Sequence, residues 1–191
     1  MHFKKNIIVT IVLLISLSIF FTGAIWIYTR STWHADKAVR NFVRQIELGN
    51  VNDIKLTIYY ALPASGQERV TVKDLIREVH HYKIVVEGTE LAEYIDTLKQ
   101  LKDINLVSVK SRTRINAGVY YVFEDRNNRK LLDVAMFGRG GGGDGFGSLS
   151  IFVNGNEVEW DDKFIEIMLP FLPESRVEGW MRTLEQRSVE R

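Results

Sequence analysis

Residues 118–137 read GVYYVFEDRNNRKLLDVAMF and predict two strands of a sheet joined by a tight turn. Apolar and aromatic side chains fill residues 118–124 and 130–137, and the turn DRNN lies between them. Asparagine and aspartate tolerate the left-handed backbone angles that tight turns require. Adjacent strands that follow one another through such turns favour antiparallel pairing. This stretch therefore predicts an antiparallel sheet as the centre of the fold.

More strands are predicted on either side of it. Alternating or continuous apolar runs place them at residues 52–60, 83–87, 105–111, 148–153 and 157–160. Asn154-Gly155 separates the last two strands and is a strong signal for a two-residue hairpin. Apolar residues at helical spacing predict helices at residues 32–48, 71–81, 89–101, 164–168 and from 175 onward. The predicted fold class is α+β: an N-terminal transmembrane helix, then one small domain with a mostly antiparallel sheet and flanking helices.

The N-terminal prediction rests on residues 7–28, which read IIVTIVLLISLSIFFTGAIWIY without a charge. A helix of this length is about 33 Å long, and a hydrocarbon core is roughly 30 Å thick. A signal peptide cleaved after Ala24 is an alternative, because residues 22–24 are small, and a buried core helix is a third. The apolar run continues through residues 25–28, which favours an uncleaved anchor.

Orientation is not decided by counting basic residues, because they occur on both sides of the apolar run. A six-residue leader with Lys4 and Lys5 is typical of a signal-anchor, so we expect the domain outside the cytoplasm. The expected location is the cell membrane, with a single integral span. The expected organisation is a short cytoplasmic leader (1–6), a transmembrane signal-anchor (7–28), a juxtamembrane helix (29–50), an extracytoplasmic α+β domain (51–173) and a C-terminal amphipathic helix (174–191).

Composition excludes several classes of function. Lys and Arg number 25 and Asp and Glu 24, so the net charge is +1 and a nucleic-acid binder is not indicated. The chain has no cysteine, which excludes a thiol nucleophile, a disulfide and a metal site built on cysteine.

A glycine-rich stretch, GRGGGGDGFG at residues 138–147, contains the pattern GxGxxG. A phosphate-binding loop would need a helix directly after it, and a strand is predicted there instead. Asp144 alone cannot supply the six to eight oxygen ligands that calcium takes. We therefore predict no nucleotide and no cofactor, and interpret the stretch as a connection between strands on which Asp144 and Phe146 are candidates for contact with a partner.

No catalytic, cofactor-binding or metal-binding residue can be named from the sequence. His80 and His81 are adjacent near a predicted helix end, so their side chains diverge and cannot chelate one ion together. Four acidic residues between 157 and 162 are explained by exposure on a strand and by helix capping.

Aromatic residues supply the remaining candidates for partner binding. Tyr59 and Tyr60 are consecutive in a predicted strand, as are Tyr120 and Tyr121, so one of each pair should face outward. We name Tyr60, Tyr121 and, on the C-terminal helix, Trp180 as such candidates.

These observations predict a membrane-anchored extracytoplasmic protein that is a non-catalytic binding or accessory module for a protein, a second membrane protein or another envelope component. The alternative is an envelope enzyme whose site is not visible as a linear motif. A third hypothesis is an accessory subunit that acts through the membrane helix itself.

Overall fold

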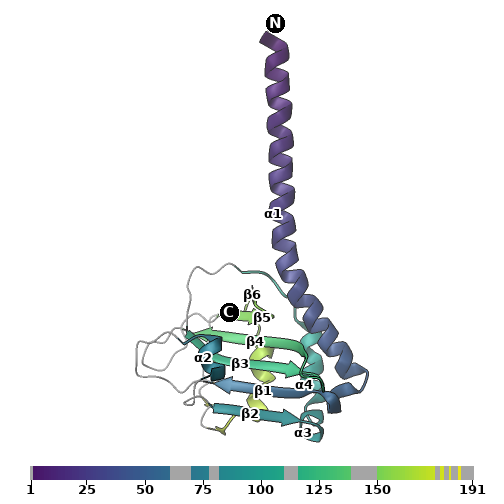
Figure 1. Cartoon of the computed structure of the whole chain (residues 1–191), viewed down its shortest axis with the longest axis vertical. Helices are drawn as coiled ribbons and strands as arrows, with labels where there is room; N and C mark the ends of the chain where they lie inside the picture. The colour runs from purple at the N-terminus through teal and green to yellow at the C-terminus, as the bar shows by residue number, and fades with distance from the viewer. Residues whose placement is uncertain are drawn as a thin grey trace.

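The computed structural model describes residues 2–60, 70–77, 82–109, 116–138 and 150–174, together with 177–178, 181 and 185. In these residues the chain forms a six-stranded antiparallel sheet with the order β2-β1-β3-β4-β5-β6, and helices pack against it (Figure 1). The predicted α+β class and antiparallel sheet are thus confirmed. The strands are β1 (Lys55–Tyr60), β2 (Tyr82–Glu87), β3 (Asn116–Glu124), β4 (Lys130–Gly138), β5 (Ser150–Val153) and β6 (Asn156–Val158).

The β3–β4 hairpin predicted from residues 118–137 is confirmed, and the strand order places it in the middle of the sheet. Asn128 takes a positive φ of 54° in the turn. Asp125 accepts hydrogen bonds at Oδ1 from the backbone N–H groups of Asn127 and Arg129, both at 2.9 Å. These bonds, with that from Arg129 as the larger effect, lower the pKa of the Asp125 carboxyl.

The second hairpin is also confirmed, because β5 pairs with β6 through Asn154 and Gly155. Their φ angles are 47° and 78°, which is the backbone that a type I′ turn requires. The strand predicted at residues 105–111 is wrong. Only Ser108 forms a β-bridge, with Val158, because β6 is three residues long and offers little edge to pair with.

The helices are α1 (His2–Glu47), η1 (Asn50–Asp53), α2 (Val72–Arg77), α3 (Thr89–Ala92), α4 (Ile95–Lys99), η2 (Gln100–Asp103), α5 (Lys163–Glu166) and η3 (Leu169–Phe171). Residues 78–81 of the helix predicted at 71–81 lie outside the described residues. The helix predicted at residues 89–101 is divided into α3, α4 and the start of η2. Their spacing predicted that Leu91, Ile95, Leu98 and Leu101 face the core; the three leucines are fully buried, and Ile95 is half-buried and packs against the core.

A capping interaction is present at the start of α2. Thr71 Oγ1 accepts a hydrogen bond from the backbone N–H of Asp74 at 3.2 Å, and Asp74 Oδ2 accepts one from the backbone N–H of Thr71 at 2.8 Å. Leu75 is buried but stands apart from the main core cluster, and α2 contacts β3 and β1. We infer that α2 covers part of the sheet face opposite the main core.

The main core lies between one face of the sheet and the C-terminal half of α1. Helical spacing brings Ala35, Val39, Phe42, Val43 and Ile46 onto one buried stripe. Phe42 is the largest of them, and its ring lies 4.4 Å from that of Phe123 on β3, centroid to centroid. α1 is therefore held to the sheet by its C-terminal half, and its other half extends away from the domain (Figure 1).

The N-terminal half of α1 corrects the prediction of a membrane anchor. Among the described residues, no helix has the combined length and apolar character that crossing a membrane requires. Within residues 7–28, side chains are described only for 13–23, and these span about 16 Å, roughly half of a hydrocarbon core. The predicted transmembrane helix, the integral single span and the cell-membrane location are contradicted by this finding. The helix also continues without a break through residues 29–47, where a separate juxtamembrane helix was predicted.

Candidate binding site

An open cleft of about 400 Å³ lies between α1 and the segment that follows α4. Residues of α1 between Trp33 and Arg40 form one wall. Residues 101–106, which comprise the end of η2 and the extended chain beyond it, form the other. The two walls are more than 60 residues apart in the sequence, so only the docking of α1 on the domain creates the cleft.

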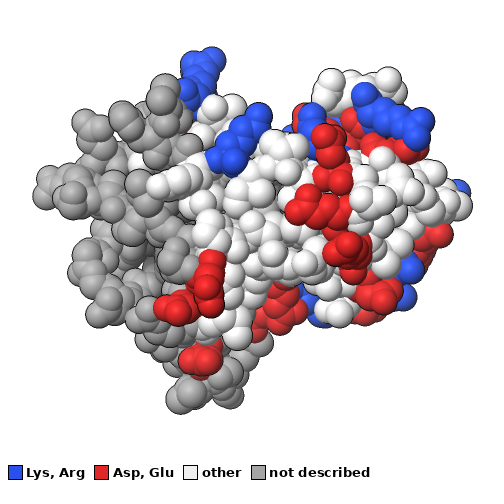
Figure 2. Space-filling view, turned by 90° about the horizontal axis from the view of Figure 1, so that it is seen from below, with Lys and Arg blue, Asp and Glu red and all other residues white. Residues whose placement is uncertain are grey.

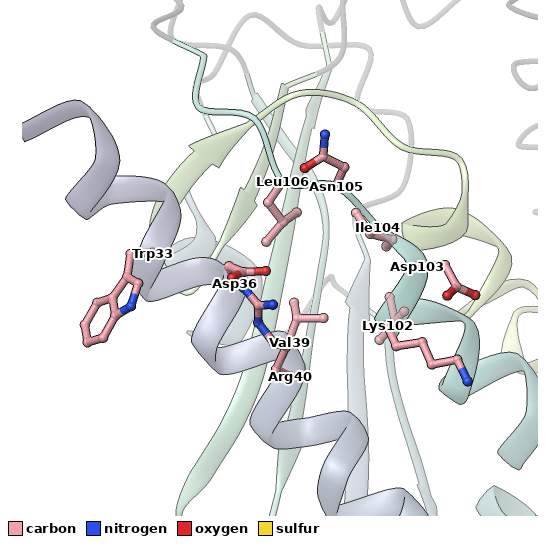
Figure 3. Close-up of a pocket in the computed structure, with 10 residues that line it drawn as sticks. Trp33, Asp36, Val39, Arg40, Lys102, Asp103, Ile104, Asn105 and Leu106 are labelled. Carbon is pink, nitrogen blue, oxygen red and sulfur yellow. Dashed lines mark ion pairs between the residues drawn. The ribbon is translucent and has the colours of Figure 1, made fainter. Parts of the chain in front are cut away.

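Apolar and polar side chains both line this cleft, and polar groups make up the larger part of its exposed surface. Val39 and Leu106 point toward the space between the two walls (Figure 3). Val39, Leu101 and Ile104 are buried, whereas Asn105 is exposed.

Two large side chains of the α1 wall are open to solvent. Trp33 is 53% exposed and lies at the outer edge of the cleft (Figure 3). Lys37 Nζ stands 4.9 Å from the centroid of the Trp33 ring, in a cation–π contact. One turn further on, Arg40 forms an ion pair with Asp36, at i and i+4 of the helix. Because the Arg40 side chain is 72% exposed, this pair orients the guanidinium and adds little stability.

A second group of polar side chains lies on the opposite face of the sheet. Tyr59 and Tyr120 are cross-strand neighbours, with ring centroids 6.1 Å apart. Tyr120 donates a hydrogen bond to Asp133 Oδ2 at 3.2 Å, and Lys130 Nζ lies 2.6 Å from the same oxygen. Lys83 Nζ stands 5.8 Å from the centroid of the Tyr59 ring. This group is a connected network in which Asp133 is held by both neighbours.

Two phenols in this sheet have pKa values well above the usual one. Burial, and then the neighbouring Asp133 carboxylate, raises the pKa of Tyr120. Burial alone raises the pKa of Tyr121, whose hydroxyl donates to the carbonyl of Phe164 at 2.9 Å. Both phenols are therefore neutral in the folded protein at any pH at which an ordinary tyrosine is neutral.

This arrangement predicts a loss of stability at alkaline pH. An unfolded tyrosine ionises near pH 10.0, whereas the folded forms of Tyr120 and Tyr121 keep their protons. The stabilising contribution is complete below about pH 10 and is lost as the pH rises above it, because only the unfolded state releases protons. We expect that the phenolate absorbance of these two residues appears together with the loss of circular dichroism. Tyr121→Phe should remove one phenol from this step. Ionisation of all tyrosines near pH 10 in a folded protein would contradict the assignment.

The residues that the sequence nominated for partner binding have mixed outcomes. Tyr60 and Tyr121 lie in the main core, and the outward members of the two pairs are Tyr59 and Tyr120. Alternation had predicted that each pair divides between the faces, but not which member is buried. Asp144, Phe146 and Trp180 lie outside the described residues. The glycine-rich stretch begins at the end of β4, and β4 and β5 are antiparallel neighbours, so its flanks are those of a strand connection.

The described residues add no candidate for metal binding or acid–base catalysis. Among them, no group of three or more His, Asp or Glu side chains could hold a metal ion. His80 and His81 are outside the described residues. The cleft contains two carboxylates, Asp36 and Asp103, and Asp36 forms an ion pair with Arg40.

No motif in the sequence predicts the cleft. Its α1 wall belongs to a predicted helix and its other wall to a predicted strand, and neither contains a motif. Trp33 and Arg40, two helical turns apart, were the only local indication of a binding surface. The same residue types also occur on helix surfaces that bind nothing.

Comparison with known proteins assigns no role to any residue of this chain. No protein-family model matches the sequence, and neither a curated protein nor a solved structure matches it.

Proposed function

We propose that this chain is a non-catalytic binding module for another protein, and that the cleft between α1 and residues 101–106 takes a segment of that partner. The observation that carries the proposal is a cleft lined by apolar and polar side chains, with a half-exposed Trp33 and a solvent-exposed Arg40 on one wall. Tryptophan and arginine are over-represented among the residues that contribute most to binding between proteins.

The charges of the cleft support a polypeptide rather than a small ion. Each wall contributes one basic and one acidic residue: Asp36 and Arg40 on α1, and Lys102 and Asp103 on the other side. A cleft built for a metabolite of one charge would carry an excess of the opposite charge. A cleft with balanced charges and a mixed polar and apolar lining suits a peptide segment, which has apolar side chains and polar backbone groups.

Site-specific photocrosslinking tests the proposal. A photoreactive amino acid is placed at Asn105, which lines the cleft and is exposed, and the full chain is crosslinked in its native cell. The matched control is the same amino acid at Asn127, an exposed position in the β3–β4 turn. We expect a crosslinked protein from position 105 and none from position 127.

The side-chain requirement is tested once that partner is purified. Trp33→Ala should weaken binding by at least about tenfold, as expected for a residue that dominates an interface. Glu47→Ala, at an exposed position near the end of α1, should leave the affinity within about twofold. Equal crosslinking from both positions, or full affinity of the Trp33→Ala variant, would overturn the assignment of the cleft.

A further inference from the structure

The β2 strand leaves one edge of the sheet open. It pairs with β1, and no other described strand lies on its second side. Tyr82 is 49% exposed, Val85 is 45% exposed, and Lys83 and Glu87 are exposed as well. The opposite edge of the sheet is different, because residues 107–109 donate and accept backbone hydrogen bonds along β6. An edge strand with free N–H and C=O groups is a template for pairing with another strand.

The sequence of β2, YKIVVE, is complementary to itself in the antiparallel direction. Lys83, Val85 and Glu87 alternate along the strand, so their side chains share one face. Lys83 and Glu87 lie at equal distances on either side of Val85. When two copies pair antiparallel with Val85 opposite Val85, each Lys83 stands opposite a Glu87 of the other copy.

We propose that β2 pairs with β2 of a second copy of this chain, about a two-fold axis at Val85, to give a continuous twelve-stranded sheet. Such an interface is isologous, because each copy contributes the same strand. Val85 meets Val85 at the centre, and two Lys83–Glu87 ion pairs flank it. Any other register places Lys83 or Glu87 opposite an apolar residue or a like charge, so the charges also fix the alignment.

Charged side chains also lie beyond the two ends of the strand. α2 lies at the end of the sheet where β2 begins, and it carries exposed Lys73 and Arg77 (Figure 1). α3 follows directly after β2 and carries exposed Glu90. Figure 2, which views the molecule from the β2 side, shows acidic side chains right of the centre and at the lower left, and basic side chains at the upper left and the upper right.

A strand from a different protein would not need this symmetry. Its pairing with β2 would depend on the sequence of that protein, and the match between Lys83 and Glu87 within one strand would have no role. The internal complementarity of β2 is therefore the observation that selects a second copy as the occupant.

Charge reversal tests the pairing in the full-length chain. Lys83→Glu makes both flanking positions acidic, and Glu87→Lys makes both basic, so neither variant can form its ion pairs with itself. Each variant alone should dimerise at least about tenfold more weakly than the wild type in analytical ultracentrifugation. An equimolar mixture of the two should recover the dimer, because the acidic strand of one faces the basic strand of the other. Both side chains are exposed, and circular dichroism checks that each variant is folded.

The same experiment separates β2 pairing from other contacts. Large apolar side chains of α1, including Leu13, Ile19 and Phe20, are also exposed, and association through them would not respond to these charges. A monomeric wild type, a dimer unaffected by either reversal, or a mixture that stays monomeric would each overturn the proposal. If the wild type did not self-associate and β2 of either variant bound a different protein instead, that result would also overturn the proposal.

A crosslink tests the register. Because the chain has no cysteine, Val85→Cys introduces its single thiol on the proposed two-fold axis. Oxidation should give a disulfide-linked dimer, since directly opposite residues of an antiparallel pair have Cα atoms about 4.5–5.5 Å apart. Ile76→Cys, at a similarly exposed position on α2, is the matched control and should remain mainly unlinked. Equal crosslinking of both variants would contradict pairing at Val85.

Discussion

Replacing Phe42 by alanine is expected to lower the free energy of unfolding by about 3–5 kcal/mol, the range for deleting a buried phenylalanine side chain. Phe42 is 0% exposed and lies between α1 and the sheet, with its ring 4.4 Å from that of Phe123. The variant would leave a cavity at the contact through which α1 is held to the domain. Because α1 is stiff, it cannot move inward at one point without disturbing Val39 and Ile46 on the same stripe. Urea denaturation followed by circular dichroism measures the loss.

The matched control is Leu48→Ala. Leu48 follows directly after α1 and is 63% exposed, so its removal should change the free energy of unfolding by no more than about 0.5 kcal/mol. Similar midpoints for the Phe42→Ala variant and the wild type would mean that α1 is not part of the folded core. In that case the cleft between α1 and residues 101–106 would also lose its basis.

Gly88→Ala is expected to cost about 1–3 kcal/mol, although the added methyl group would touch nothing. Gly88 joins β2 to α3 with φ 65° and ψ −130°, a conformation that is accessible to glycine and strongly unfavourable for other residues. No atom outside its neighbours lies within 4 Å of the position that a Cβ would take. The loss would therefore come from the backbone alone. Thermal or urea denaturation measures it.

Two other glycines separate backbone strain from steric clash. Gly49 has φ 81° and ψ 11°, a left-handed conformation that asparagine also adopts, so Gly49→Asn should be nearly neutral. Gly88→Asn should remain destabilising, because asparagine does not favour the conformation at residue 88. Gly23→Ala lies within α1, where an added Cβ also meets nothing, and it should not reduce stability. A Gly88→Ala variant as stable as the wild type would contradict the backbone described between β2 and α3.

Features that depend on interactions between residues close together in the sequence were predicted correctly. The β3–β4 hairpin and the Asn154-Gly155 turn were predicted because their backbone angles depend on the residues in the turn. The buried stripe of Leu91, Leu98 and Leu101 was predicted because helical spacing sets which side chains share a face, even though the helix itself is broken. The division of Tyr120 and Tyr121 between two faces follows from the geometry of a strand.

Predictions from hydropathy and alternation were wrong at two places where the length of an element decided the outcome. Residues 105–111 have the composition of a strand, but the edge available to them is only three residues long. The apolar residues 7–28 predicted a membrane span that the described residues do not support.

The sequence by itself determined the fold class, the two hairpins and the buried faces of the helices, because these depend on interactions within a few residues. Only the tertiary structure decided that Tyr121 rather than Tyr120 is buried, since the choice depends on which face of the sheet receives α1. The same docking brings Trp33 and Arg40 to residues 101–106 and so creates the cleft. Strand order, too, is a property of the whole chain: β2 is an edge because β3 pairs with the other side of β1. Contacts across tens of residues depend on how complete surfaces fit together, and no local pattern records that fit.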